Sequence, residues 1–369
     1  MKVLHILATP RAEGTPNLVL DWLAAGDFEQ DVFVLHSQPA DLSENLEKTA
    51  AWYGESNYFS DGIRKFINIA RGVFRVCRDR RPDVILCWPT GFANWVCLGA
   101  RLAGVRHLLV HAGNPPTRGI RGDVMSRYVL WPLTLLGGNV ICCSRYVMSQ
   151  YQAVPWVPKR LFYAVWNCAR SGSVRERAAK SRALRQTPDR HQRLIMVATL
   201  ESHKDHPTLF RSLPHIVKKF PELRLILVGE GSLRNQLEAQ VAALNIQEYV
   251  EFFGMRNDVP ELLGTSDLFV FSTTSQEGLG TVLIEAMAAE LSIVATDVPA
   301  CREILSDGTY GTLVPPNDEL AMADAIISHF EKPSSRADKT DLFRYTCQFS
   351  AEEMIRKYLL ISQGHGAES

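Results

Sequence analysis

Hydrophobic and polar positions follow two alternating patterns along most of the chain. Short apolar runs, typical of buried strands, alternate with longer segments whose apolar positions repeat at helical spacing. This alternation predicts a mostly parallel, doubly wound α/β sheet in which helices connect successive strands. In the first half we expect strands at 3–7, 31–35, 84–87, 107–111 and 140–144, and helices at 16–25, 62–80, 93–103, 124–136 and 145–150.

The alternation stops after residue 170 and resumes at residue 194. The interval from Ser171 to Gln192 is rich in Arg and Lys and poor in large apolar residues, which indicates an exposed linker with a short helix. A chain of 369 residues also exceeds a single typical core. We therefore expect two Rossmann-like domains at 1–170 and 193–340, joined by the linker 171–192. A C-terminal segment at 341–369 contains a last helix at 351–361.

Composition and charge exclude several classes of protein. Lys plus Arg and Asp plus Glu each number 40, and zero net charge argues against a dedicated nucleic-acid binder. The eight cysteines form no C-x-x-C pair, and no Cys and His cluster has the spacing of zinc ligands. The apolar start, Met1–Ala8, is too short for a signal peptide, and no stretch reaches the length of a transmembrane helix. These observations predict a cytoplasmic protein without metal or cofactor.

The stretch Ser275–Glu290 carries the chemistry on which the functional prediction depends. It follows an apolar run at 268–271, and Gly278 and Gly280 precede a helix-forming segment. Glycines let backbone N–H groups approach an anion, and a helix N-terminus adds a partial positive charge. Ligands of open α/β sheets bind outside the carboxyl ends of the strands, where this loop is expected. Phosphates can therefore bind the main chain, which leaves the carboxylates of Glu277 and Glu285 for hydroxyls, as a sugar nucleotide requires.

This stretch resembles the E-x7-E signature of the retaining glycosyltransferases of family 4. The matching residues are Glu277-Gly278-Leu279-Gly280, Glu285-Ala286-Met287-Ala288 and Val294-Ala295-Thr296-Asp297. The resemblance implies the GT-B architecture, in which two Rossmann-like domains face each other across a cleft and the last helix crosses back to the first domain. It also implies that the transferred sugar retains its anomeric configuration.

The resemblance assigns donor-binding roles in the second half of the chain. Glu277 would hold hydroxyls of the donor sugar and Glu285 the ribose, while the loop Gly278-Leu279-Gly280-Thr281 would hold phosphates. The segment Thr199–Lys204 matches a family segment in which an Arg and a Lys both reach the diphosphate. Lys204 is present, but Thr199 stands at the Arg position.

Further candidates flank these segments. Arg256 ends Phe253-Gly254-Met255-Arg256, which resembles a segment whose backbone contacts the nucleobase. His111 in Val110-His111-Ala112-Gly113 resembles a strand end that presents a histidine to the donor sugar, although a lone histidine is often structural. The resemblance implies a glycine-rich loop beneath acceptor and diphosphate at residues 11–15, and of its glycines only Gly14 is present. Gly229 and Gly231 fit a tight strand-to-helix turn better than a binding role.

The expected helix at Gly62–Arg81 has an apolar face and a strongly basic face. Such a helix can dock on anionic lipid, which would place the protein peripherally on the cytoplasmic face of a membrane and suit a lipid-linked acceptor. Amphipathicity is also the default for a surface helix that faces a core. Both interpretations stay open.

No D-x-D metal-binding motif occurs in the chain, so the charge of a leaving diphosphate would be stabilised by Lys204 and backbone N–H groups. We therefore predict a retaining, metal-independent glycosyltransferase. It would move a sugar from a nucleotide-diphosphate sugar, with UDP or GDP, to an acceptor hydroxyl in polysaccharide or glycolipid assembly. A nucleotide-sugar epimerase and a non-catalytic partner subunit of the same fold are the alternatives. A dinucleotide dehydrogenase is excluded because no G-x-G-x-x-G follows either first strand.

Overall fold

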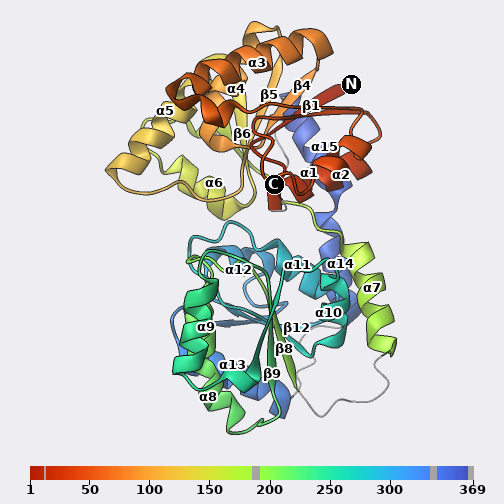
Figure 1. The fold of residues 1–369 in the computed structure, drawn as a ribbon, viewed down its shortest axis with the longest axis vertical. Coiled ribbons are helices and arrows are strands. Elements are labelled where there is room, and N and C mark those ends of the chain that lie inside the picture. The colour runs from red at the N-terminus through yellow and green to blue at the C-terminus, as the bar shows by residue number, and fades with distance from the viewer. Residues whose placement is uncertain (12–13, 185–191, 333–338, 365–369) are drawn as a thin grey trace. The chain divides into compact units, whose positions relative to one another are not determined.

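The computed structural model describes residues 1–11, 14–184, 192–332 and 339–364. The chain divides into unit 1, which comprises Met1–Cys168 and the segment from Ala351 onward, and unit 2, which comprises Ala169–Ser350. Each unit is built on a parallel sheet with helices packed against it (Figure 1). The prediction of two Rossmann-like α/β domains is confirmed.

Within the described residues, unit 1 forms a seven-stranded parallel sheet in the order β3-β2-β1-β4-β5-β6-β7. Its strands are β1 Lys2–Leu7, β2 Glu29–Val34, β3 Trp52–Glu55, β4 Val84–Cys87, β5 His107–Ala112, β6 Gly138–Cys142 and β7 Phe162–Ala164. The central strand β4 is buried throughout, which explains why it is a continuous apolar run in the sequence. The edge strands β3 and β7 are short and only partly buried, so they carry no comparable signal.

All but the last of the helices of unit 1 connect successive strands of this sheet. They are α1 Gly14–Ala25, α2 Ser43–Thr49, α3 Lys65–Arg80, α4 Ala93–Leu102, α5 Ile120–Leu136, α6 Arg145–Gln152 and α15 Ala351–Ser362. The amphipathic α-helix expected from Gly62 begins only at Lys65, because Gly62, with φ 58°, kinks the preceding 3₁₀ segment Tyr58–Arg64. The apolar face of α3, with Ile69, Val73 and Cys77, is buried in unit 1.

Helix α15 completes the core of unit 1. Its residues Met354, Ile355, Tyr358 and Ile361 are buried against α1 and the sheet. The Trp22 indole donates a hydrogen bond to Met354 Sδ at 3.4 Å, and the rings of Trp22 and Tyr358 lie 5.1 Å apart. Unit 1 is therefore assembled from two segments of the chain that lie on either side of unit 2 in the sequence.

In the part of unit 2 that the structure describes, six parallel strands lie in the order β10-β9-β8-β11-β12-β13. They are β8 Arg193–Val197, β9 Arg224–Val228, β10 Val250–Gly254, β11 Leu268–Phe271, β12 Ser292–Thr296 and β13 Thr312–Val314. The helices are α7 Ser171–Leu184, α8 His206–Val217, α9 Arg234–Ala243, α10 Val259–Thr265, α11 Thr281–Ala288, α12 Pro299–Ile304, α13 Glu319–Glu331 and α14 Lys339–Thr346.

Helix α7 corrects the interpretation of residues 171–184 as an exposed linker. Helix α7 packs on α10 with Val174 and Ala178 buried, and a Cβ on Gly264 of α10 would lie 2.2 Å from the Ala178 carbonyl oxygen. Arg177 forms an ion pair of 2.6 Å with Glu261. The basic residues are therefore partly paired within unit 2, although their density in the sequence suggested a solvated segment. The rest of the expected linker, 185–191, lies outside the described residues.

Two properties of the described ranges bear on the sequence predictions. None of their helices is long and apolar enough to cross a membrane. Seven cysteines are buried as free thiols, and Cys347 is exposed.

Candidate active site

The candidate site in unit 2 lies where the strand order of the sheet reverses. From β8 the chain proceeds to β9 on one side, and β11 lies on the other side of β8. The loops that leave the carboxyl ends of β8 and β11 diverge at this point, which is where open α/β sheets bind ligands. The first loop carries Lys204 and the second carries Glu277.

Lys204 and Glu277 form an ion pair, in which Nζ donates a hydrogen bond to Oε2. The two side chains are only 11% and 10% exposed. The Lys204 ammonium also lies 4.8 Å from the ring centroid of Phe271, the last residue of β11. Thr273 Oγ1 lies 3.3 Å from Glu277 Oε2. The pair is thus held between apolar and polar partners with little contact with solvent.

The environment of Glu277 favours its charged form. Burial by itself raises the pKa of a carboxyl group, but the nearby charge and hydrogen bond of Lys204 have the opposite effect, assisted by His203 and Thr273. The net result is a Glu277 pKa below its ordinary value. Burial lowers the pKa of His203, and the neighbouring Lys204 adds to this effect. The site therefore holds a carboxylate and an ammonium beside a largely neutral imidazole at physiological pH.

Backbone hydrogen bonds lock the two loops together. The His203 carbonyl accepts hydrogen bonds from Thr274 N and Thr274 Oγ1, both at 3.1 Å. Asp205 N donates to the Ser272 carbonyl at 3.1 Å, and Thr273 N donates to Thr296 Oγ1 at 3.1 Å. Because these contacts do not involve the charged groups, they preorganise Lys204 and Glu277 independently of the ion pair.

Helix α11 begins directly after this loop. Gly280 is its N-cap with φ 75°, a conformation that favours glycine, and a Cβ there would approach Leu283 and Phe271 at 3.3 Å. Thr281 is the first residue of the helix, and Glu285 lies about one turn later and is half-buried. Gly278 and Leu279 are both buried, so the Leu279 side chain packs in the core and can offer a ligand only its backbone.

The other candidates of unit 2 lie in loops at the same edge of the sheet. Thr199 is exposed, two residues beyond β8. Arg256 follows β10 and forms a bidentate pair with Asp258, at 2.6 and 2.8 Å. A Cβ on Gly229 would lie 2.1 Å from the Ala198 carbonyl oxygen, and one on Gly231 would lie 2.4 Å from that of Leu200. Close approach of the backbone therefore requires both glycines, whereas the sequence suggested only a tight strand-to-helix turn.

Three residues of this site were not singled out from the sequence. Thr273 and His203 contribute a hydrogen bond between the two loops, and Thr296 connects the second loop to β12. The threonines could have been noticed, because Thr273-Thr274 follows the buried strand β11 and Thr296 ends β12. The His203 contribution comes from its carbonyl oxygen, which no sequence pattern indicates.

In unit 1, His111 lies near the carboxyl end of β5 and is almost fully buried. Its Nδ1 lies 2.8 Å from the hydroxyl of Tyr358 on α15, and its ring is 4.9 Å from that of Trp88. Burial lowers the pKa of His111 to about 4, so the imidazole is neutral near pH 7. Tyr358, 247 residues away in sequence, was not predicted as a partner.

Gly14 is the first residue of α1, after β1. A Cβ at this position would meet nothing within 4 Å, so no steric reason requires glycine there. Ala12 and Glu13, part of the loop predicted to lie beneath the acceptor, are outside the described residues.

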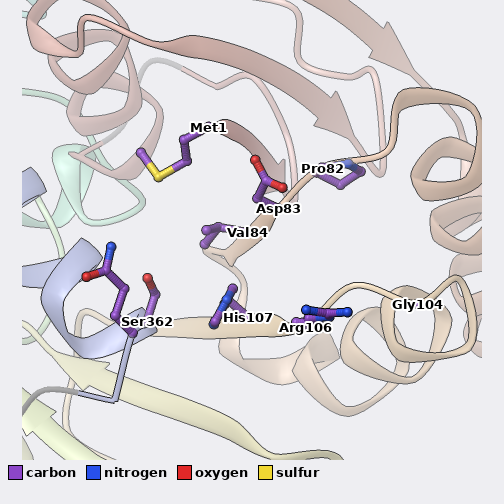
Figure 2. Close-up of a pocket in the computed structure, with 9 residues that line it drawn as sticks. Met1, Pro82, Asp83, Val84, Gly104, Arg106, His107 and Ser362 are labelled. Atoms are coloured by element: carbon purple, nitrogen blue, oxygen red, sulfur yellow. The ribbon is translucent and has the colours of Figure 1, made fainter.

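A separate hollow of about 450 Å³ lies at the opposite edge of the unit 1 sheet (Figure 2). Asp83 and Val84 line it at the amino end of β4, and His107 lines it at the amino end of β5. Asp83 also accepts a hydrogen bond of 2.8 Å from Lys2 N. Because ligands of such sheets bind at the carboxyl edge, this hollow is not the candidate active site.

Comparisons with known proteins found relatives in sequence and in fold. Residues 179–341, which lie within unit 2, match the model of the family described as glycosyl transferases group 1. The phosphatidyl-myo-inositol mannosyltransferase of Mycobacterium tuberculosis is 33% identical over 179 residues, which are 46% of this chain and 46% of that protein. The chain therefore matches less than half the length of this curated relative.

Similarity to solved structures extends over nearly the whole chain. The structure of Anabaena HepE in complex with UDP and glucose has a TM-score of 0.82, with 17% identity and 99% of both chains covered. A glycosyltransferase from Rickettsia africae has a TM-score of 0.80, with 18% identity and 98% of both chains covered. Unit 2 therefore carries a domain of the glycosyl transferases group 1 family, and the chain has the GT-B fold of glycosyltransferases.

Proposed function

We propose that this protein is a retaining, metal-independent glycosyltransferase that moves a sugar from a nucleotide-diphosphate sugar to an acceptor hydroxyl. The observation that carries the proposal is the buried pair of Lys204 and Glu277, at the point where the unit 2 sheet reverses its strand order. The E-x7-E text around Glu277 and the family match of residues 179–341 support the same conclusion.

On binding, the diphosphate of the donor would replace Glu277 as the partner of Lys204. A diphosphate carries more negative charge than one carboxylate, so it competes with Glu277 for the Lys204 ammonium. Lys204 is a compact cation that suits phosphate as a point charge. Glu277, once released, can accept hydrogen bonds from the hydroxyls of the donor sugar. The backbone N–H groups after Gly280 and the N-terminus of α11 add positive potential for the same diphosphate.

Lys204 would also act on the reaction itself. Cleavage of the bond between sugar and phosphate leaves negative charge on the departing diphosphate, and a preorganised cation lowers the energy of that transition state. Glu277 is poorly suited as a general base, because its pKa lies below the usual carboxyl value. We therefore infer that the departing phosphate assists deprotonation of the acceptor hydroxyl on the same face of the sugar, which retains the configuration.

We infer metal independence from the same charges. The sequence has no D-x-D motif, and Lys204 can stabilise the diphosphate charge that a metal ion would otherwise stabilise. Because HepE binds UDP and glucose in its solved structure, we take UDP-sugars as the first donors to test. The mannosyltransferase relative is named for a lipid acceptor, which supports an acceptor in glycolipid or polysaccharide assembly.

The experiment measures donor binding and transfer separately. UDP- and GDP-sugars are screened for thermal stabilisation of the protein, because a ligand of the folded state raises the melting temperature. Competent donors are then assayed with lipid-linked and free sugar acceptors, for wild type and Glu277→Gln. The matched control is Glu331→Gln, whose partner Lys219 forms an exposed ion pair with it at 2.7 Å. We expect loss of transfer in Glu277→Gln alone.

The outcomes separate the alternatives. Donor epimerisation in the absence of acceptor would indicate an epimerase, and failure to bind any sugar nucleotide would indicate a non-catalytic subunit. The anomeric proton of the product, observed by NMR, decides between retention and inversion. Undiminished transfer in EDTA would agree with metal independence, and loss that added Mg²⁺ or Mn²⁺ restores would contradict it.

A further inference from the structure

The outer face of helix α5 exposes an unusual series of large apolar side chains. Ile120, Val124, Tyr128, Trp131 and Leu135 recur at intervals of three or four residues, and each is exposed. At the pitch of an α-helix they fall within an arc of roughly 80°. Ile120 is 87% exposed and Leu135 is 78% exposed. We call these five residues, together with Met125 and Trp156, the apolar stripe.

The stripe cannot be explained as the core-facing side of an amphipathic helix. The buried residues of α5 are Gly122, Val129, Leu130 and Leu133, which lie on the opposite side of the helix. Helix α5 packs on α4 and β6 with that side. A helix with apolar residues on both faces normally has a second apolar partner. Contiguous exposed apolar surface of this kind marks an interaction site.

Trp156 extends the stripe beyond the helix. It lies between α6 and the 3₁₀ segment Lys159–Leu161, and its side chain is 80% exposed. The Trp131 indole donates a hydrogen bond of 2.9 Å to the Trp156 carbonyl, which joins the two tryptophans. Trp156 has φ 68°, a backbone conformation that a bulky residue adopts only when its surroundings enforce it. Exposed Trp and Tyr are typical of surfaces that enter the interfacial zone of a bilayer.

The charges around the stripe identify its partner. Asp123 is the single acidic residue in the sequence from 114 to 160, whereas this interval contains the six basic residues Arg118, Arg121, Arg127, Arg145, Lys159 and Arg160. Arg121 and Arg127 flank the row of Ile120, Val124, Tyr128, Trp131 and Leu135 on its two sides at helical spacing. A second copy of the chain would bring two such basic rims together, which is unfavourable in a symmetric interface. An anionic lipid surface complements both the apolar residues and the basic rim.

Helix α3, the candidate for membrane contact in the sequence, differs in this respect. Its apolar side is buried in unit 1, and the exposed part presents basic residues such as Arg71 and Arg75. Among the exposed large apolar residues of the described chain, Ile67 is the only one that belongs to α3. Basic charge without insertable side chains gives weaker and more salt-sensitive attraction to a bilayer.

We propose that the apolar stripe of unit 1 docks on the surface of an anionic lipid bilayer. Ile120, Leu135 and the two tryptophans enter the interfacial zone, and the surrounding arginines contact lipid phosphates. Helix α5 starts after the carboxyl end of β5, near which His111 lies, and returns to the amino end of β6. The stripe therefore starts at the catalytic edge of the unit 1 sheet, where a lipid-linked acceptor would arrive. Docking itself does not rest on the proposed transferase activity.

The test uses the full chain and vesicles made of equal parts phosphatidylcholine and phosphatidylglycerol, with phosphatidylcholine alone for comparison. We expect sedimentation with the anionic vesicles, weakened by salt. The partition coefficient should fall about tenfold or more for each of Ile120→Ser and Leu135→Ser, because each removes a large insertable group. It should fall about fivefold for each of Arg118→Gln and Arg121→Gln. Brominated lipid should quench fluorescence in wild type more than in Trp156→Phe.

Control variants show whether loss of binding is specific to the apolar stripe. Leu184→Ser and Leu320→Ser remove exposed apolar residues of unit 2, and Arg71→Gln with Arg75→Gln removes charge from α3. We expect these variants to bind vesicles as wild type does. Circular dichroism and stabilisation by the donor should be unchanged in the stripe variants, because the replaced side chains are exposed.

Three results would overturn the proposal. The first is that wild type does not bind anionic vesicles. The second is that the stripe variants bind as well as wild type, or that only the α3 variant loses binding. The third is a dimer, seen by analytical ultracentrifugation, that Ile120→Ser and Leu135→Ser abolish while vesicle binding stays unchanged.

Discussion

The ion pair of Lys204 and Glu277 makes a quantitative prediction about stability. Lys204→Met replaces the ammonium with an apolar group of similar length, and Glu277→Gln replaces the carboxylate with a neutral group of the same shape. Each single variant leaves one buried charge without its partner. The double variant leaves none. Comparing the three variants with wild type therefore measures the coupling of the two groups.

The magnitude follows from the burial of the pair. Opposite charges at hydrogen-bonding distance attract by about 5 kcal/mol at an effective dielectric constant of about 20. Removing each ion from water costs several kcal/mol, so the net contribution of the pair is much smaller. Leaving one charge buried and unpaired costs about 3 kcal/mol or more. We expect each single variant to lose about that amount, and the double variant to lose about 2–3 kcal/mol less than the sum.

The assay has to observe unit 2 specifically. All seven tryptophans lie at or before Trp166, so intrinsic fluorescence reports on unit 1. Hydrogen exchange of peptides from β8 and β11, measured along a urea titration, gives the stability of the sheet that holds the pair. The exposed pair Lys219 and Glu331 serves as the control, with a coupling of about 1 kcal/mol or less.

Additivity would refute this reasoning. If the losses of Lys204→Met and Glu277→Gln add up in the double variant to within about 0.5 kcal/mol, the two groups do not interact in solution. The exchange of partners that we propose for donor binding would then lack its starting state. Transfer should be lost in the double variant in any case, since the stability of the pair and its catalytic use are separate properties.

Three further predictions address other parts of the molecule. Tyr358→Phe removes the hydrogen bond to His111, so the free energy of unfolding of unit 1, measured by fluorescence, should fall by about 1 kcal/mol. The transfer rate should also fall while donor binding is kept. An unchanged rate would mean that His111 has a structural role alone. Because the pKa of Glu277 is lowered in the folded state, its charge stabilises unit 2 above the unfolded pKa. Hydrogen exchange of unit 2 should show this stabilisation disappearing as pH falls through the folded pKa. Glu277→Gln should lack this pH-dependent part of the stability. Gly229→Ala should destabilise unit 2 by more than about 2 kcal/mol, because its Cβ would meet a carbonyl oxygen at 2.1 Å, whereas Gly14→Ala should be nearly neutral in thermal unfolding.

The location of the unit 2 site was accessible from the sequence because it depends on the backbone. Apolar runs predict where β8 and β11 end, and the loops after them carry Lys204 and Glu277. Their direct contact was not predicted, because the two residues are 73 positions apart and the sequence does not specify side-chain directions. The contact of His111 with Tyr358 was missed for the same reason.

Other errors came from composition. The arginines of α7 suggested a solvated linker, but Arg175 and Arg177 pair with Glu290 and Glu261, which are distant in sequence. The pattern at 124–136 predicted a helix, but it did not indicate which apolar residues of α5 are exposed. Which of them face outward is decided by packing on α4 and β6, and hence the apolar stripe became visible only in three dimensions.

The return of helix α15 to unit 1 has a consequence for biosynthesis. Tyr358 and Ile361 belong to the core of unit 1, so this core stays open on one side until the ribosome has delivered helix α15. Unit 2 is complete at Ser350 and can fold earlier, although most of unit 1 is synthesised before it. During that interval the nascent chain exposes the surface around Trp22 that α15 later covers. In newly made protein this surface is therefore open to chaperone capture and aggregation until α15, which is far away in sequence, covers it.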